Sequence, residues 1–124
     1  MSDSKYDRGL RLRKEVLGEA YVNGSIDGAT DFDRPLQKLL TENCWGEVWS
    51  RDGISLQTRS LITIAILAAR RASTELKVHV RGALNNGCTA EEIQEVLLHA
   101  TVYCGAPAGL EAFRAAKEVI EGDG

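Results

Sequence analysis

The sequence predicts an all-α fold, compact and built from several packed helices. Apolar residues recur every three or four positions along most of the 124 residues, which is the spacing of one helix face. Short breaks marked by glycine separate these segments, and no stretch shows the alternation that a strand requires. The chain has the length of one ordinary domain, so we expect a single domain over residues 1–124.

The first half of the chain predicts two helices. A loop over residues 23–28, which are rich in turn formers, should separate them. The second helix is expected to begin near Pro35 and to end between residues 43 and 46, with a further turn over residues 47–49. The first helix is indicated by four residues at helical spacing: Tyr6, Leu10, Leu17 and Tyr21.

The third predicted helix follows Ser55, a typical N-cap residue. Residues 61–69 are apolar on every side, which predicts the buried centre of the fold. Ser73 is expected to cap the next helix, and Gly87 is expected to follow its end in the C′ position. The buried stripe of this helix is predicted to be Leu76, Val80, Ala83 and Leu84.

The clearest local signal is the pair Thr89 and Glu92, whose spacing predicts a capping box at the start of a helix. Gly105 is expected to end that helix, and Pro107 suits the first turn of the last one. The apolar face of the first of these two helices is predicted to be Ile93, Val96, Leu97, Ala100 and Cys104. That of the last helix is predicted to be Leu110, Phe113 and Ile120.

Composition and charge exclude several classes of protein. Apolar residues make up 44% of the chain and charged residues 27%, which excludes a disordered or fibrous protein. The net charge of −3 argues against nucleic-acid binding, and no apolar run is long enough to cross a membrane. We find no secretory signal, and three widely spaced cysteines suit a reducing compartment, so a cytoplasmic protein is expected. A chain this short leaves much surface uncovered, which favours self-association.

Two histidines are candidates for chemistry. His79 follows Glu75 by four residues on one helix face, where the carboxylate could orient the imidazole and raise its pKa. The alternative is an ordinary polar surface pair. His99 precedes Tyr103 by four residues, and the two could form a hydrogen-bonded couple at an interface; the alternative is that His99 simply borders an apolar stripe. The sequence offers no set of ligands at metal-binding spacing, so we expect no metal.

Both tryptophans of the chain fall in one short segment with an acid and a base. Trp45 and Trp49 could supply flat apolar walls, Glu47 could carry a proton, and Arg51 could clamp a carboxylate. The alternative is the end of a core helix, with its tryptophans packed and its charges in water. Further arginines could clamp anions: Arg59, Arg70, Arg71 and Arg81.

Several segments in colinear order resemble the carboxymuconolactone decarboxylase family, in its 4-carboxymuconolactone decarboxylase branch. A second branch, the alkylhydroperoxidase-like proteins, shares the fold and uses a Cys-x-x-Cys pair ahead of the matching histidine. Here those positions hold Ala72 and Glu75, which argues against thiol peroxidase chemistry. The resembling segments cover nearly the whole chain: residues 13–18, 45–51, 58–61, 75–83, 86–87, 92–99 and 102–108.

The resemblance implies an alkylhydroperoxidase-like fold and a carboxy-lyase that needs no cofactor. Its substrate would be the lactone carboxylate 4-carboxymuconolactone, converted to 3-oxoadipate enol-lactone in protocatechuate catabolism. The same resemblance implies assembly of copies, commonly as a homohexamer. Residues 70–74 and 109–111 carry more charge than this branch leads us to expect, which leaves a related lactone acid open as the substrate. A non-enzymatic oligomeric module of the same fold is the other alternative.

The resemblance also implies roles for the candidate residues. His79 would be the hydrogen-bond donor or general acid, oriented by Glu75, with Glu47 as a second proton carrier. Which of the acids or His99 acts with His79 stays open. The residues expected to bind the substrate are Arg51, Arg81, Trp45, Trp49 and His99.

Overall fold

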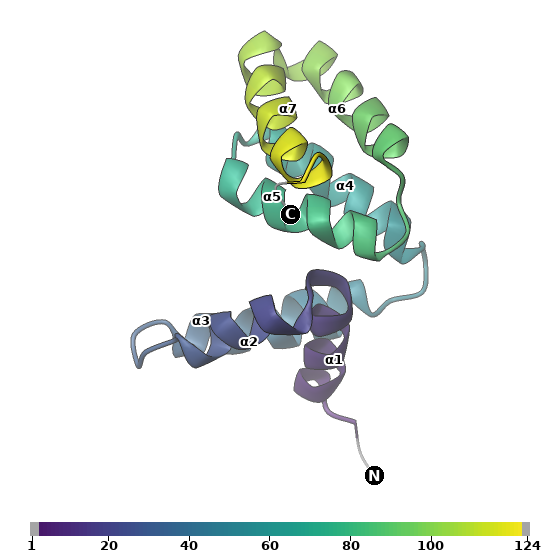
Figure 1. Cartoon of the computed structure of the whole chain (residues 1–124). Helices are drawn as coiled ribbons and strands as arrows, with labels where there is room; N and C mark the ends of the chain where they lie inside the picture. Colours follow the sequence, from purple (N-terminus) through teal and green to yellow (C-terminus); the bar gives the residue numbers. More distant parts are fainter. Residues whose placement is uncertain (1–2, 123–124) are drawn as a thin grey trace. The chain divides into compact units, whose positions relative to one another are not determined.

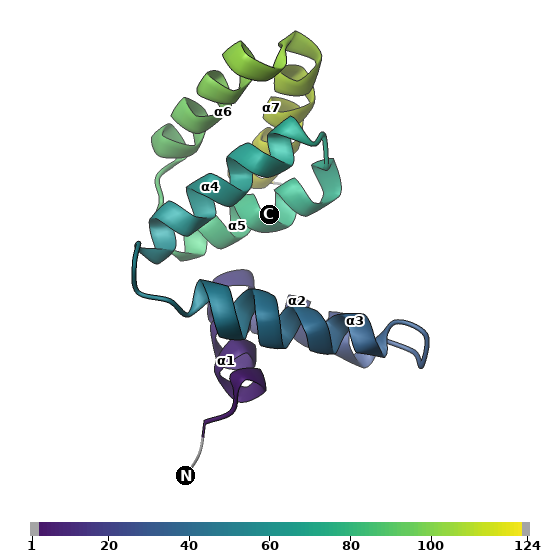
Figure 2. The ribbon, with the colours of Figure 1, turned by 180° about the vertical axis from the view of Figure 1, so that it is seen from behind.

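The computed structural model describes residues 3–122, and every regular element among them is helical (Figures 1 and 2). The predicted all-α class is therefore confirmed. The chain divides into two compact units, with the boundary between Ile54 and Ser55, and each unit is described by itself. The expectation of one domain over residues 1–124 stays a prediction.

The first unit contains α1 (Lys5–Leu17), α2 (Glu19–Asp27), α3 (Arg34–Leu39) and a π-helix, η1 (Leu40–Trp49). Gly18 separates α1 from α2 because its backbone adopts a φ of +97°, which glycine reaches without strain. The prediction of one helix through Tyr21 is therefore wrong. The predicted loop over residues 23–28 is wrong as well, since α2 continues to Asp27 through turn-forming residues.

The π-helix η1 continues directly from α3, so that the two form one rod (Figure 2). The predicted helix end between residues 43 and 46 is wrong, because Gly46 lies inside η1. Glycine is needed there for packing: a Cβ at Gly46 would collide with the carbonyl oxygen of Lys5 in α1, and a Cβ at Gly9 would collide with that of Thr41. The backbones of α1 and η1 thus meet at Gly9 and Gly46.

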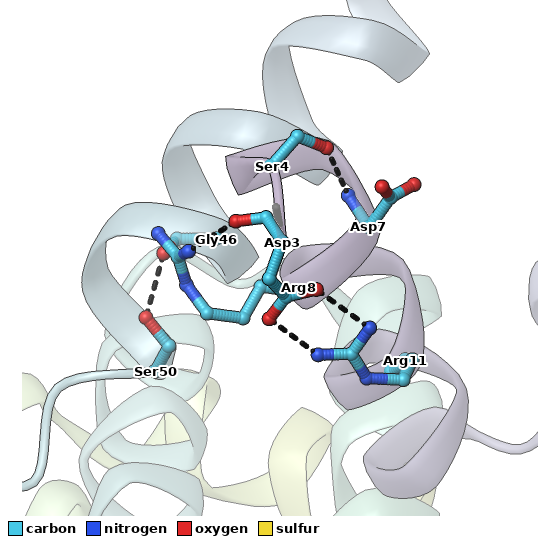
Figure 3. Close-up of polar contacts among 7 residues, drawn as sticks. All are labelled: Asp3, Ser4, Asp7, Arg8, Arg11, Gly46 and Ser50. Atoms are coloured by element: carbon cyan, nitrogen blue, oxygen red, sulfur yellow. Dashed lines mark hydrogen bonds and ion pairs between the residues drawn. The ribbon is translucent and has the colours of Figure 1, made fainter. Parts of the chain in front are cut away.

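Polar contacts add to this packing. Ser4 caps α1 by accepting a hydrogen bond from the backbone N–H of Asp7 at 3.0 Å. Figure 3 shows that contact, the Arg8 guanidinium donating to the carbonyl oxygen of Asp3, and the Ser50 hydroxyl donating to the carbonyl oxygen of Gly46 at 2.6 Å. These hydrogen bonds stabilise the start of α1 and the end of η1.

The second unit contains α4 (Leu56–Ala69), α5 (Ser73–Asn85), α6 (Ala90–Cys104) and α7 (Ala106–Ile120). The helices α4 and α5 lie side by side, as do α6 and α7 (Figures 1 and 2). Residues from all four helices share one apolar core, whose largest fully buried side chains are Ile64, Leu76, Ile93 and Leu97.

Several local predictions for this unit are confirmed. Ser55 caps α4, Gly87 follows α5 with a φ of +91°, and Thr89 and Glu92 form the capping box. The predicted cap at Ser73 is wrong, because α5 begins at that residue and the N-cap position is Ala72, which makes no side-chain bond.

Burial differs from the prediction on α4 and α7. Ile62 and Ile66 are about half exposed, so α4 is buried on one side only. On α7 the predicted face is displaced, and Leu110 is 63% exposed. The buried positions of α7 are small residues, which let this helix approach its neighbours closely: Ala108, Gly109, Ala112, Ala115, Ala116 and Val119.

The capping box yields a stability prediction. Thr89→Ala removes the acceptor for the backbone N–H of Glu92, a bond of 3.0 Å, and should lower the free energy of unfolding by about 1 kcal/mol. Thr74→Ala, at an exposed position inside α5, is the matched control and should not destabilise. Urea denaturation followed by circular dichroism measures both, and equal midpoints would contradict the role of the cap.

Candidate active site

The tryptophans predicted as walls lie on η1 in the first unit. Trp45 and Trp49 are both buried, and their rings stack with centroids 4.5 Å apart and an interplanar angle of 23°. The four-residue spacing and the π-helical backbone bring the rings together. A π-helix is rare and is frequently found at functional sites, so the backbone itself marks this segment.

Glu47 lies between the two tryptophans in the sequence, and Arg51 follows the second by two residues. Glu47 is exposed on η1, and its carboxylate lies 3.1 Å from the ammonium of Lys5 in α1. Arg51 follows the end of η1, is exposed, and donates its backbone N–H to the carbonyl oxygen of Val48. Within these seven residues the two tryptophans are therefore packed inside the first unit while Glu47 and Arg51 are exposed, which is the arrangement of the alternative, a core helix end with its charges in water.

His79 lies on α5 in the second unit and is mostly buried, whereas Glu75 one turn earlier is exposed. Burial lowers the pKa of His79 to about 4, and the opposing effect of the Glu75 charge is smaller. The expectation that Glu75 would raise the pKa of His79 above its ordinary value is therefore wrong. At neutral pH this histidine is an uncharged imidazole with one N–H donor.

The low pKa of His79 predicts a pH-dependent stability. In the unfolded chain His79 binds a proton below pH 6.5, whereas in the folded chain it does so only below about pH 4. Stability present above pH 6.5 is therefore lost as the pH falls toward 4. Between pH 7.5 and 5 the wild type should lose about 2 kcal/mol more than His79→Gln. Urea titrations of both proteins at each pH measure the free energies of unfolding. Equal losses of stability in the wild type and in His79→Gln would contradict the prediction.

The remaining predicted residues of the second unit are exposed. Arg81 lies two residues after His79 on α5. On α6 the rings of His99 and Tyr103 contact each other in a tilted arrangement, with centroids 5.1 Å apart. The two rings therefore contact each other, and the predicted hydrogen bond at an interface stays a prediction. The candidates fall into two sets, one on each unit.

The two segments of unusual charge are joined to each other. The Arg71 guanidinium donates through Nε and Nη2 to the two carboxylate oxygens of Glu111, at 2.8 and 3.0 Å. This pairing lowers the pKa of Glu111. Because its hydrogen-bonding face is occupied, Arg71 is a weak candidate for clamping a substrate.

The sequence predictions missed Arg13. This residue is only 5% exposed, and its Nη1 donates a hydrogen bond to the hydroxyl of buried Thr41 at 3.1 Å. Burial lowers the pKa of its guanidinium. The signal was present in the sequence, since Arg13 lies three residues after Leu10 and four before Leu17, on the apolar stripe of α1.

Cysteines and acids do not gather into a further site. Within residues 3–122, no three of the histidine, cysteine, aspartate and glutamate side chains are grouped so that they could hold a metal ion. The three thiols are free; Cys88 is buried, and burial is the main cause that raises its pKa. None of the helices described is long and apolar enough to span a membrane.

The chain is similar to known proteins over most of its length. The profile of the carboxymuconolactone decarboxylase family matches residues 34–118. The 4-carboxymuconolactone decarboxylase of Acinetobacter baylyi is 44% identical over 119 residues, covering 96% of this chain and 89% of that protein. The nitrosuccinic acid decarboxylase of Metarhizium robertsii is 46% identical over 115 residues, covering 93% of this chain and 80% of that protein.

Proposed function

Because the chain belongs to the carboxymuconolactone decarboxylase family and is a decarboxylase, we propose that its substrate is 4-carboxymuconolactone. The product would be 3-oxoadipate enol-lactone, formed in protocatechuate catabolism. The observation that most supports this substrate is the similarity to the 4-carboxymuconolactone decarboxylase of Acinetobacter baylyi, which aligns with 96% of the chain.

The proposed reaction needs no cofactor because the substrate holds its own electron sink. The departing carboxylate sits on the γ-carbon of an unsaturated lactone, so its bonding electrons move through the double bond to the lactone carbonyl oxygen. CO₂ leaves as this bond breaks, and the resulting dienolate is then protonated on carbon. A site for this reaction requires a donor to the lactone oxygen, a clamp for the carboxylate that stays, an apolar wall beside the one that leaves, and a proton source.

His79 suits the role of hydrogen-bond donor to the lactone oxygen. A neutral imidazole can give its N–H as a hydrogen bond to the oxygen on which negative charge develops, and a pKa of about 4 keeps it neutral at pH 7. The same pKa disfavours a resting imidazolium, so we assign His79 as hydrogen-bond donor rather than general acid. Glu75 would orient the ring, and Glu47 would carry the proton.

The other roles follow from side-chain type. Arg51 and Arg81 are exposed guanidiniums that can each form a two-point contact with a carboxylate. The stacked rings of Trp45 and Trp49 would form the apolar wall, and His99 would contribute to substrate binding. We further propose that the protein is a single-domain, cytoplasmic homohexamer.

Nitrosuccinate is the second candidate substrate, supported by the relative that is 46% identical. The two compounds share a chemical pattern, because in each the departing carboxylate is on a carbon that also bears a carboxymethyl group. In each, the electrons flow into an oxygen-rich sink, a lactone in one and a nitro group in the other. One arginine clamp and one donor such as His79 could therefore serve either compound.

Comparing kcat/KM for the two compounds tests the proposed substrate. The purified protein should turn over 4-carboxymuconolactone with a kcat/KM at least tenfold above that for nitrosuccinate. The reverse order would transfer the proposal to nitrosuccinate and keep the decarboxylase. Slow turnover of both would indicate a related lactone acid.

A further inference from the structure

The second unit has a groove between α6 and α7, with a cavity volume of about 450 Å³. A volume of this size is typical of pockets that hold small molecules. Apolar side chains line it from both helices, Ile93 and Leu97 from α6 and Phe113 and Ile120 from α7. Leu110 also lines the groove and is 63% exposed, so apolar surface is open to solvent here. The apolar body of a ligand could cover this surface.

The groove is long and narrow. On α7 its lining runs from Leu110 to Ile120, which is about 15 Å along the helix axis. On α6 it runs from Ala90 to Leu97, which is about 10 Å. A cavity of 450 Å³ that is spread along this length suits an extended ligand better than a compact one.

One wall of the groove carries two cations. Arg114 and Lys117 are both exposed, and their spacing of three residues makes them neighbours on α7. Within residues 3–122 neither forms a salt bridge, and the acid next to Lys117, Glu118, is paired with Lys77 of α5 at 2.7 Å. Glu121 is the acid of the lining and lies past the end of α7. Two cations and one acid leave one positive charge, which a ligand with a single carboxylate would balance.

We propose that the α6–α7 groove is a second ligand site, which binds a linear carboxylate of medium chain length. The ligand carboxylate lies between Arg114 and Lys117, where it accepts charge-assisted hydrogen bonds and is kept away from Glu121. The alkyl chain covers the apolar side chains of Ile93 and Leu97. A dicarboxylate is disfavoured, because its second charge would lie on the apolar floor. No residue proposed for catalysis or substrate binding lines this groove.

Calorimetric titration with octanoate tests the proposal. The wild type should bind octanoate with a Kd of about 1 mM or tighter. From hexanoate to octanoate, each added methylene should tighten binding about threefold, because each is buried in the groove. Octanol and octylamine keep the chain and change the head group, so each should bind about fivefold more weakly or worse.

Variants at exposed positions locate the bound octanoate. Arg114→Gln and Lys117→Gln should each weaken octanoate binding about fivefold and leave octanol binding unchanged. Leu110→Gln should weaken both ligands, because it removes apolar surface from the groove. Arg81→Gln is the matched control: it removes an exposed arginine of the same unit that lies outside the groove, and it should bind octanoate like the wild type.

Three results would overturn the proposal. One is no detectable binding of octanoate to the folded wild type, which a groove covered by a second copy would give. Another is equal affinity for octanoate, octanol and octylamine. The third is loss of octanoate binding in Arg81→Gln but not in Arg114→Gln, since the ligand would then occupy the proposed catalytic site. Decarboxylase activity is not a readout of these titrations, so this proposal and the proposed function fail separately.

Discussion

Replacing His79 with alanine is expected to lower kcat for decarboxylation by about 100- to 1,000-fold, which is the usual loss when a donor to a developing negative charge is removed. The loss is expected because the variant lacks the donor, which is the N–H of a mostly buried, neutral imidazole with a pKa of about 4. Steady-state kinetics at pH 7.5, with loss of lactone followed directly, measures the effect.

His79→Gln separates two roles for this histidine. Glutamine can still donate an N–H but cannot exchange a proton near neutral pH, so it should recover part of the activity that alanine loses. Equal inactivity of both variants would instead indicate proton transfer by the imidazole. Thr89→Ala controls for reduced stability, because it acts on a helix cap and should leave kcat unchanged. Full turnover by a folded His79→Ala protein would contradict the assignment.

The second large effect is a loss of stability, expected when Gly9 is replaced at the point where α1 meets η1. A Cβ there would collide with the carbonyl oxygen of Thr41 and lie 2.7 Å from the backbone nitrogen of Gly46. Because both neighbours are backbone atoms, relief requires the helices to separate, and Gly9→Ala should cost about 3 kcal/mol. Both tryptophans lie on η1, so urea denaturation followed by their fluorescence reports on this unit directly.

Gly24→Ala is the matched control for Gly9→Ala. Gly24 lies inside α2, and a Cβ there would meet nothing within 4 Å. Alanine is the better helix former, so this variant should be as stable as the wild type or up to about 1 kcal/mol more stable. Similar midpoints for the two variants would contradict the close contact of α1 with η1.

The sequence predicted the second unit better than the first, because local signals dominate there. The capping box at Thr89 and the glycine after α5 act within a few residues, so their outcome does not depend on distant packing. On α7 the prediction followed the largest apolar side chains and missed the face of small residues. That face is buried because alanine allows close helix contact, which cannot be read from hydrophobicity alone.

In the first unit, glycines have two structural roles that the sequence alone does not distinguish. Gly18 ends a helix through its positive φ, whereas Gly46 lies inside one because the backbone of another helix passes beside it. The tryptophan segment was therefore recognised by its residue types, but its π-helical backbone was not predicted. At His79 the spacing revealed the nearby carboxylate and could not reveal burial, which decides the direction of the pKa shift.

We propose that this protein removes CO₂ from 4-carboxymuconolactone using only its own side chains. The most direct measurement follows lactone consumption and CO₂ release together by the purified protein, after dialysis against a chelator and with no cofactor added. We expect rapid turnover, with one CO₂ released for each lactone consumed. No release of CO₂ by the folded protein, or activity that returns only when a metal or cofactor is supplied, would contradict it.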